Sequence, residues 1–345
     1  MDSTQPIGVL LLQLGTPDSP STKDVRRYLS EFLSDPRVMD ISAPVRWLVL
    51  NAVILPFRPR RSAKAYQMIW SEEGSPLLVH TEALAKDVQA SLGDGYLVDF
   101  AMRYGSPSIA GALDRLVAAD VNDIRILPLF PHYASSAGGS ATQRTMELLA
   151  ERWNVPTVSF LPEFYDDPGF LAAVANAAAE ELGRFRPDHV LFSYHGLPER
   201  QVRKADPSGA HCLATESCCD TIGPVNRRCY RAQCFATTRS LATTLHLTSD
   251  AHSTAFQSRL AGTPWITPHT DRVLQGLHDS GVRRLAVLTP SFVSDCLETL
   301  EEIGIRLRKQ WIELGGEDLL LVPCINEAPL WVDTVAAMVS GEERP

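Results

Sequence analysis

The segment HVLFSYHGLPERQVRKADP, residues 189–207, joins an uninterrupted apolar run to a polar one. Its first half is typical of a central strand in a parallel sheet, because such strands are buried on both faces. The run passes directly into Ser193, Tyr194, His195 and Gly196. Open α/β sheets bind their ligands at the carboxyl ends of the strands. The segment therefore predicts both an α/β fold and a functional role for His195.

Further apolar strands and amphipathic helices alternate along the rest of the chain. Strands are predicted at Ile7–Leu14, Leu97–Met102, Ile124–Phe130, Leu285–Thr289 and Leu319–Val322. Helices are predicted at Thr22–Leu33, Thr81–Leu92, Ile109–Ala118, Gly169–Phe185 and Cys296–Gln310. This order indicates parallel sheets that are flanked by helices on both faces. The 345 residues are enough for two such units, which we divide near residues 153–157.

Composition limits the class of protein and its partners. The chain is 45% hydrophobic and 21% charged, as in a globular protein, and its net charge of -9 argues against nucleic acid as a partner. The N-terminal segment lacks the basic region of a signal peptide, so we expect a cytoplasmic protein with reduced thiols. No phosphate-binding glycine pattern follows the first strand, so a nucleotide-dependent enzyme is not favoured.

Three carboxylates follow the strand predicted at Leu285–Thr289. Asp295, Glu298 and Glu302 are spaced i, i+3 and i+7, which would place them along one face of a helix. Glu298 and Glu302 repel each other at this spacing by roughly a few tenths of a kcal/mol. A bound cation or proton transfer along the row would explain that cost. A solvated acidic face is the alternative interpretation.

Residues 43–64 combine an apolar run with a basic one. The apolar part, Trp47–Phe57, is about half as long as the ~20 residues that a membrane-spanning helix needs. One interpretation is a core helix followed by a solvated basic loop. The other is an exposed apolar lip that contacts a membrane or an apolar ligand, with cations near anionic groups. The cations are Arg58, Arg60, Arg61 and Lys64.

Five of the seven cysteines lie within residues 212–234, namely Cys212, Cys218, Cys219, Cys229 and Cys234. In a reducing compartment, clustered cysteines bind metal more often than they form disulfides. An iron–sulfur cluster, a zinc site and loosely packed free thiols are all compatible with the pattern. The adjacent side chains of Cys218 and Cys219 are expected to diverge, so that only one of the two would bind metal.

Seven motifs together resemble those of ferrochelatase, the family that inserts ferrous iron into a porphyrin. In family order they are LLLQLGTPDSP, SEEGSPL, AMRYGSP, FPHYASS, FSYHGLPER, FQSR with PWITPHTD, and SDCLETLEEI. The resemblance extends from residue 8 to about residue 334. It implies two Rossmann-like, chelatase-type domains. The first would comprise residues 1–153 and about 325–345, with the lip at 43–64, and the second residues 154–324, with the cysteine-rich insertion at 212–234.

The resemblance also implies roles for individual residues. The catalytic histidine of the family falls on His195 and its active-site glutamate on Glu298. Asp295 and Glu302 match an acidic path for metal or protons. His195 would either accept the pyrrole protons or bind the iron first. The positions that match porphyrin-binding residues are Leu14, Arg103, Tyr104, Tyr133, Ser136, Trp265 and Phe292.

Two positions depart from parts of the family, and the insertion implies a cofactor. Leu14 stands where coproporphyrin-using members tend to have tyrosine, which favours protoporphyrin IX. Cys296 stands where animal members have a second histidine, so a possible metal ligand is removed or replaced by a softer one. Some members carry a 2Fe–2S cluster. Its ligands here would be Cys212, Cys219, Cys229 and Cys234, with Cys218 as the alternative.

The sequence therefore predicts a lyase that inserts Fe²⁺ into protoporphyrin IX and releases two protons to form protohaem. Its partners would be the porphyrin and ferrous iron, with peripheral contact of the lip at the inner face of the membrane. Three alternatives are compatible with the same motifs. They are a coproporphyrin ferrochelatase, a chelatase for another tetrapyrrole or metal, and a metal- or haem-binding sensor with a degenerate site.

Overall fold

The computed structural model describes residues 5–259 and 262–341 and separates into two compact units. Unit 1 comprises residues 1–130, 134–163 and 326–345, and unit 2 comprises residues 131–133 and 164–325. Residues 260–261, within the predicted Trp265 motif, lie outside the described residues. Each unit contains one four-stranded parallel sheet. The α/β fold predicted from the sequence is therefore confirmed.

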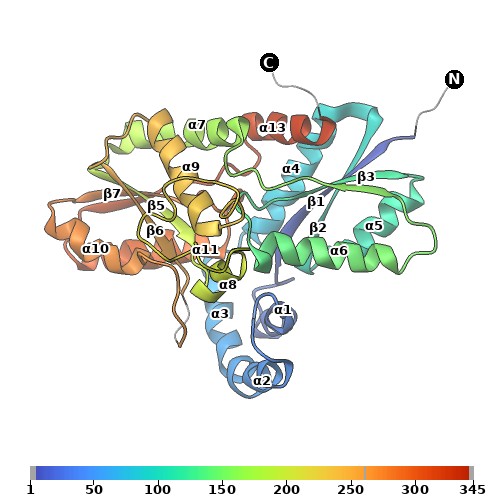
Figure 1. The fold of residues 1–345 in the computed structure, drawn as a ribbon, viewed down its shortest axis with the longest axis horizontal. Helices are drawn as coiled ribbons and strands as arrows, with labels where there is room; N and C mark the ends of the chain where they lie inside the picture. The colour runs from blue at the N-terminus through green and yellow to red at the C-terminus, as the bar shows by residue number, and fades with distance from the viewer. Residues whose placement is uncertain (1–4, 260–261, 342–345) are drawn as a thin grey trace. The chain divides into compact units, whose positions relative to one another are not determined.

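Unit 1 is built on the strand order β2-β1-β3-β4. The strands are β1 (Ile7–Thr16), β2 (Tyr96–Gly105), β3 (Asp123–Pro128) and β4 (Thr157–Phe160). Val9 to Leu12 of the central strand β1 are completely buried, as a strand covered on both faces requires. The sheet is flanked by α5 and α6 on one side and by α4 and α13 on the other (Figure 1). Those helices are α4 (Pro76–Leu92), α5 (Ile109–Ala118), α6 (Ser140–Ala150) and α13 (Pro329–Ser340).

The C-terminal helix α13 belongs to unit 1 although it follows unit 2 in the sequence. It packs against α4, and Arg125 of β3 donates hydrogen bonds to the carbonyls of Val339 and Ser340 at its end. Because a helix end leaves its last carbonyls without intrahelical donors, the Arg125 guanidinium both satisfies these groups and fixes α13 to the sheet.

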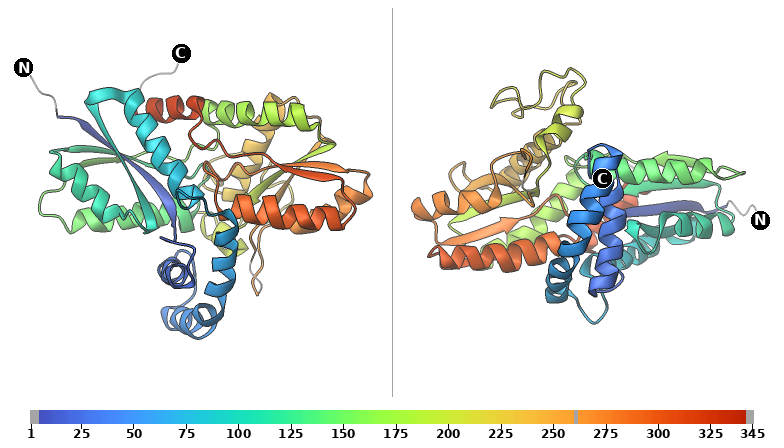
Figure 2. Two further views of the ribbon diagram at one scale, coloured as in Figure 1. Left: turned by 180° about the vertical axis from the view of Figure 1, so that it is seen from behind. Right: turned by 90° about the horizontal axis from the view of Figure 1, so that it is seen from below.

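Unit 2 repeats the arrangement with the order β6-β5-β7-β8. The strands are β5 (His189–His195), β6 (His252–Gln257), β7 (Arg284–Leu288) and β8 (Asp318–Leu321). Its main helices are α7 (Pro168–Phe185), α8 (Glu199–Lys204), α9 (Tyr230–Thr244), α10 (Thr270–Asp279), α11 (Leu297–Thr299) and α12 (Arg308–Glu313). The segment between α8 and α9 has turns but neither helix nor strand, and it forms the long yellow-green loop of Figure 2.

The sequence analysis missed two strands, β4 and β6, and both lie at the edge of a sheet. The four residues of β4 alternate between exposed and partly buried, and β6 begins with three polar residues, His252, Ser253 and Thr254. An edge strand packs against one neighbour only, so its sequence need not be a continuous apolar run. A continuous apolar run, the pattern that identified the central strands, is therefore absent from β4 and β6.

The lip extends from unit 1 as three consecutive helical segments that follow α1 (Thr22–Ser34). They are α2 (Ala43–Leu48), the π-helical η1 (Val49–Ile54) and α3 (Leu55–Ile69). Large apolar side chains on them are exposed, with 66% of Trp47 and 75% of Phe57 accessible to solvent. Among the residues that the structure describes, no helix is both long and apolar enough to cross a membrane.

Candidate active site

His195 is the last residue of β5 and is partly exposed at the carboxyl end of the unit 2 sheet. Its Nδ1 lies 2.7 Å from the carbonyl oxygen of Gly196. Because a carbonyl can only accept, Nδ1 must carry a proton there. In the neutral imidazole the other nitrogen, Nε2, then keeps its lone pair. This lone pair can accept a proton or bind a metal ion.

The segment after β7 places two further residues beside His195. The Ser291 hydroxyl accepts a hydrogen bond of 3.0 Å from the His195 backbone N–H. The Phe292 ring lies edge-on to the imidazole, with the ring centroids 6.2 Å apart. Phe292 was predicted to contact the porphyrin, and the structure places it next to His195. The contact with porphyrin stays a prediction.

The acidic row differs from the single helical face that its spacing suggested. Asp295 precedes the helix, because Cys296 is the N-cap and has an extended backbone. The carboxylate of Asp295 is buried and accepts a hydrogen bond of 3.0 Å from the hydroxyl of Thr299. The predicted placement of Asp295 on one helical face with Glu298 and Glu302 is therefore wrong. The spacing argument assumed that the helix had already begun at Asp295.

Glu298 and Glu302 lie where α11 continues into the π-helical segment η4 (Leu300–Leu307). Such π-helical turns are rare and are frequent at functional sites. Burial raises the pKa of Glu302, although hydrogen bonds from Ser258 and the charge of Arg306 act in the opposite direction. His195 lowers and Glu298 raises the pKa of Glu302 through their charges, so Glu302 interacts with both groups.

Two residues that the sequence analysis did not single out hold this site together. The buried side chain of Gln257 accepts from the Ser193 hydroxyl at 2.8 Å and donates to the Glu298 carbonyl at 2.7 Å. Ser258 donates to the two carboxylate oxygens of Glu302 through its backbone N–H and its hydroxyl. Ser258 has φ of 65°, an uncommon conformation for a residue other than glycine. Both residues lie in the motif FQSR, and this motif was the feature of the sequence that could have identified them.

The loop that carries Trp265 is attached to the segment that follows His195. Trp265 pairs with Pro198 in an isolated antiparallel bridge, and Ile266 N–H donates to the Leu197 carbonyl. A Cβ on Gly196 would lie 2.7 Å from the Gln257 carbonyl oxygen and 3.3 Å from the Trp265 ring. Gly196 therefore permits the close approach of this loop. The Trp265 indole N–H is buried without a hydrogen-bond partner among the described residues.

In unit 1, the predicted porphyrin-binding residues form part of a buried polar network. Leu14 is partly exposed near the end of β1. Arg103 and Tyr104, near the end of β2, both donate to the buried carboxylate of Asp35 at 2.8 Å, and Ser140 donates to the same oxygen. Tyr104 is completely buried. This burial is at odds with the predicted direct contact between Tyr104 and porphyrin, since hydrogen bonding to Asp35 holds the ring inside unit 1.

The other two predicted porphyrin-binding residues belong to different units. Ser136 is partly exposed in the π-helical turn η3 (Ser135–Gly139) of unit 1. Tyr133 belongs to unit 2, where its N–H donates to the Gln233 side chain and its ring lies under the Arg228 guanidinium at 5.1 Å. The structure thus places Tyr133 beside the cysteine-rich segment, a neighbour that the sequence did not indicate.

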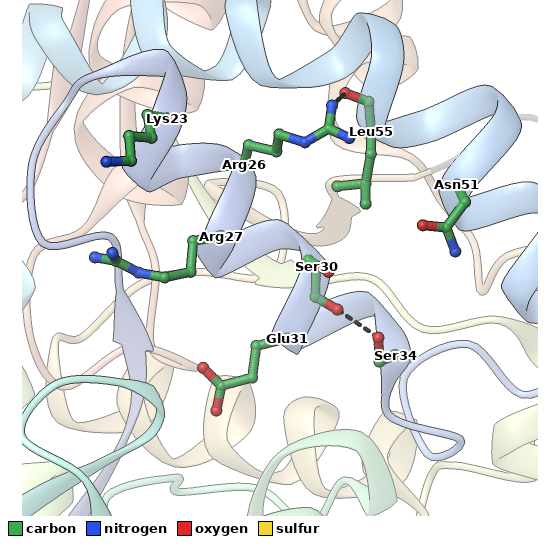
Figure 3. A pocket seen from close by; sticks show the side chains of 8 residues that line it. All are labelled: Lys23, Arg26, Arg27, Ser30, Glu31, Ser34, Asn51 and Leu55. Carbon is green, nitrogen blue, oxygen red and sulfur yellow. Dashed lines mark hydrogen bonds between the residues drawn. The ribbon is translucent and has the colours of Figure 1, made fainter.

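An open cavity of about 570 Å³ lies in unit 1 between α1 and the lip (Figure 3). Its two arginines already have protein partners. Arg26 donates to the Leu55 carbonyl at 2.6 Å, and Arg27 pairs with Asp18 and with Asp24. None of the predicted site residues lines this cavity. Its lining consists of Lys23, Arg26, Arg27, Ser30, Glu31, Ser34, Asn51 and Leu55.

Four thiols of the cysteine-rich segment contact one another. The free thiols of Cys212 and Cys219 each interact with that of Cys229, and the Cys218 and Cys219 sulfurs are 3.7 Å apart. The expectation that the Cys218 and Cys219 side chains diverge is therefore wrong. The turns of the loop direct both sulfurs to the same side. Burial raises the pKa of the Cys212 thiol, and the hydrogen bond to Cys229 raises that of Cys219.

The fifth thiol has a different environment. Cys234 is completely buried within α9, and burial raises its pKa well above the usual value. It interacts with the Tyr230 hydroxyl. Among residues 5–259 and 262–341, no three His, Cys, Asp or Glu side chains are arranged to hold a metal ion. The four thiols around Cys229 fit an iron–sulfur cluster in the chemistry of their donors, which are all sulfur, but their present arrangement is not a metal site.

Residues 6–343 match the family model described as ferrochelatase. The chain belongs to the ferrochelatase family. It is 48% identical over 332 residues to a ferrochelatase of Coxiella burnetii (strain CbuK_Q154), covering 96% of this chain and 92% of that protein. It is 46% identical over 336 residues to a ferrochelatase of Legionella pneumophila (strain Paris), covering 97% of this chain and 99% of that protein. The family predicted from the seven motifs is confirmed.

Among solved structures, the fold of this ferrochelatase-family chain is similar to that of SirB from Bacillus subtilis with Fe³⁺. The TM-score is 0.53 at 12% identity, with 97% of this chain and 96% of that chain covered. A second similar structure is DR2241 from Deinococcus radiodurans, a multi-domain protein described as structurally similar to chelatases. Its TM-score is 0.50 at 12% identity, with 99% of this chain and 56% of that chain covered. At these identities the similarity concerns the fold alone.

Proposed function

We propose that this chain is a ferrochelatase that inserts Fe²⁺ into protoporphyrin IX, forms protohaem and releases two protons. One observation supports this function above the others. His195 lies at the carboxyl end of one sheet, and the Glu302 carboxylate interacts electrostatically with both His195 and Glu298. The relatives named ferrochelatase, similar over nearly the full length, support the same activity.

The chemistry requires a base and a route for a cation. Insertion removes two protons from the pyrrole nitrogens and delivers one Fe²⁺ to the macrocycle. His195 Nε2 is the group that accepts the pyrrole protons in this proposal, since Nδ1 is held by the Gly196 carbonyl. Glu298 contacts the iron or the departing protons. Gln257 and Ser258 fix the Glu298 backbone and the Glu302 carboxylate.

The proposed porphyrin is protoporphyrin IX because Leu14 is apolar and partly exposed near the end of β1. Purified protein, Fe²⁺ and either protoporphyrin IX or coproporphyrin should be mixed without oxygen, and the metal-dependent shift of the porphyrin absorption bands recorded. We expect faster insertion with protoporphyrin IX. Faster insertion with coproporphyrin would show that the chain is a coproporphyrin ferrochelatase instead. Binding of porphyrin without any metal insertion would indicate a metal- or haem-binding sensor. Turnover with Co²⁺ but not with Fe²⁺ would indicate a chelatase for another metal.

We further propose that the cysteine-rich segment holds a 2Fe–2S cluster. Its supports are the all-sulfur donor set and the contacts among Cys212, Cys218, Cys219 and Cys229. These contacts favour Cys218 over Cys234 as the fourth ligand. Asp206 fixes the backbone at the start of the loop. Its carboxylate accepts hydrogen bonds from the backbone N–H groups at residues 208, 211 and 212. When bound, such a cluster supplies one-electron redox chemistry.

The cluster proposal predicts protein with visible absorption and about two irons per chain. Cys218→Ser should abolish the absorption and the bound iron, whereas Cys234→Ser should retain both. Iron analysis and visible spectroscopy of the two variants provide the measurement. Colourless protein that contains zinc would contradict the cluster. Loss of the cluster in Cys234→Ser but not in Cys218→Ser would show that Cys234, and not Cys218, is the fourth ligand.

The lip is proposed to touch a membrane surface without crossing it. Exposed Val45, Trp47, Leu48, Val53 and Phe57 form its apolar part, and exposed arginines follow on α3. Apolar side chains next to cations suit the interface of an anionic bilayer. Co-sedimentation with vesicles that contain phosphatidylglycerol should detect binding, and the double variant Trp47→Ser with Phe57→Ser should reduce the bound fraction about tenfold or more. Equal sedimentation of both proteins would contradict the contact.

A further inference from the structure

The backbone N–H and carbonyl of His195 are each hydrogen-bonded to a side chain. The His195 N–H donates to the Ser291 hydroxyl at 3.0 Å, and the Tyr230 hydroxyl donates to the His195 carbonyl at 2.7 Å. The Ser291 hydroxyl also interacts with that of Tyr230 and lowers its pKa, against the larger effect of burial. Both polar groups of the His195 backbone are thus fixed.

Tyr230 also occupies the junction between the cysteine-rich loop and the core of unit 2. It is the first residue of α9, and the residue before it, Cys229, is the N-cap of that helix. The free Cys229 thiol interacts with the thiols of Cys212 and Cys219 in the loop. Any change that moves the Cys229 backbone therefore moves the start of α9, and with it the Tyr230 ring.

The surroundings of Tyr230 make it a rigid connection. Its ring is buried and packs edge-on against the His132 ring, with the centroids 5.8 Å apart. The Cys234 thiol, one turn along α9, interacts with its hydroxyl. Since a buried hydroxyl in such packing has few alternative partners, a displacement of the ring breaks the hydrogen bond to the His195 carbonyl.

We propose that Tyr230 is a positioning residue that couples the cysteine-rich loop to the backbone of His195. The state of the four loop thiols, free or bound to a metal centre, then affects iron insertion through the Cys229–Tyr230 peptide. This inference rests on the proposed function for the role of His195. The coupling itself depends only on the contacts within unit 2.

Tyr230→Phe removes the hydroxyl and keeps the ring, and Tyr194→Phe is the matched control. Tyr194 is another buried tyrosine of unit 2, but its hydroxyl forms its hydrogen bond with the hydroxyl of Thr238. Tyr230→Phe should lower kcat for iron insertion about tenfold with little change in the porphyrin KM, because a small displacement of a reacting group is costly. Tyr194→Phe should retain the wild-type kcat. Equal kcat values for the two variants would overturn the inference.

The coupling is tested by a double-mutant cycle with Cys229→Ser. That substitution should lower kcat in the wild-type background and should have almost no further effect when Tyr230→Phe is present. If the decrease in kcat of the double variant equals the product of the two single decreases, the loop and Tyr230 act independently, and the proposal is contradicted. If Tyr230→Phe does not fold, Ser291→Ala removes the other side-chain partner of the His195 backbone and takes its place in the cycle.

A spectroscopic measurement separates this inference from the proposed function. The imidazole ¹⁵N signals of His195, identified by their loss in His195→Ala, should shift in Tyr230→Phe and stay in place in Tyr194→Phe. Unshifted signals in Tyr230→Phe would overturn the positioning role. If the signals shift in Tyr230→Phe but the wild-type protein inserts no iron, the positioning role of Tyr230 holds and the proposed function is rejected.

Discussion

Replacing His195 by alanine should lower the rate of iron insertion by about 10²- to 10⁴-fold, the range usual for loss of a general base. Porphyrin affinity should change little, because the imidazole is one small group beside a large apolar disc. The rate is followed by the absorption shift of protoporphyrin IX at saturating Fe²⁺, and the affinity by titration without metal. Near-normal turnover in the variant would contradict the proposed role of His195.

The dependence on iron concentration separates the two roles that the sequence left open. If His195 accepts protons, kcat falls and extra Fe²⁺ does not restore it. If His195 binds the incoming iron first, the main effect is a higher KM for Fe²⁺. Glu298→Gln, which removes charge and keeps shape, should also lower turnover severely. Glu313→Gln is the control, since Glu313 is an exposed carboxylate on α12 that pairs with Lys309 at 3.8 Å.

Asp35→Ala should cost unit 1 about 3–5 kcal/mol of stability, as expected when one partner of a buried ion pair is removed. The Asp35 carboxylate is 5% exposed and accepts from Arg103, Tyr104, Ser140 and the N–H of Arg37. Its loss removes the charged acceptor of Arg103 and Tyr104 and leaves them with Ser140, a neutral partner. Urea denaturation measures the change in the free energy of unfolding.

The matched control for Asp35 is Asp114→Ala. Asp114 also pairs with an arginine, Arg152, but its side chain is 70% exposed. Because exposed pairs contribute about 0–1 kcal/mol, this variant should remain close to the wild type. Equal losses of stability in the two variants would show that the Asp35 network has no special importance.

The Asp35 network also gives a direction for the pH dependence of stability. Burial raises the pKa of Asp35, but hydrogen bonds from Ser140, Arg37 and Tyr104 and the Arg103 charge outweigh it, so the folded pKa lies below the ordinary 3.8. A carboxyl with a depressed folded pKa contributes stability that is complete above its unfolded pKa. That contribution is lost as the pH falls through the folded pKa. Asp35→Ala should therefore show a weaker loss of stability below about pH 4 than the wild type.

The central strands and the active-site motifs could be predicted from the sequence because both are local signals. A strand buried on both faces is usually a nearly continuous apolar run, and β1, β5 and β7 each contain such a run. His195 was identified because it follows such a run directly. The edge strands β4 and β6 lacked the signal, since one flank of each is free of a neighbouring strand.

The partners of the site residues could not be predicted in the same way. Gln257 is 64 residues from Ser193 and 41 from Glu298, yet its side chain bonds with both. Asp35 is 105 residues from Ser140. Such contacts depend on strand order and register, which sequence spacing does not report. The same limit explains Asp295, because regular spacing could not reveal that the helix begins after Cys296.

The sequence by itself determined the fold class, the ferrochelatase family and the candidate pair His195 and Glu298, because each depends on residue types in a short stretch of chain. Only the tertiary structure decided that Tyr104 is buried against Asp35, that Cys218 and Cys219 direct their sulfurs together, and that Tyr230 holds the His195 carbonyl. Each of these depends on packing between distant segments, where burial and hydrogen-bond geometry select a single arrangement that local sequence leaves undefined.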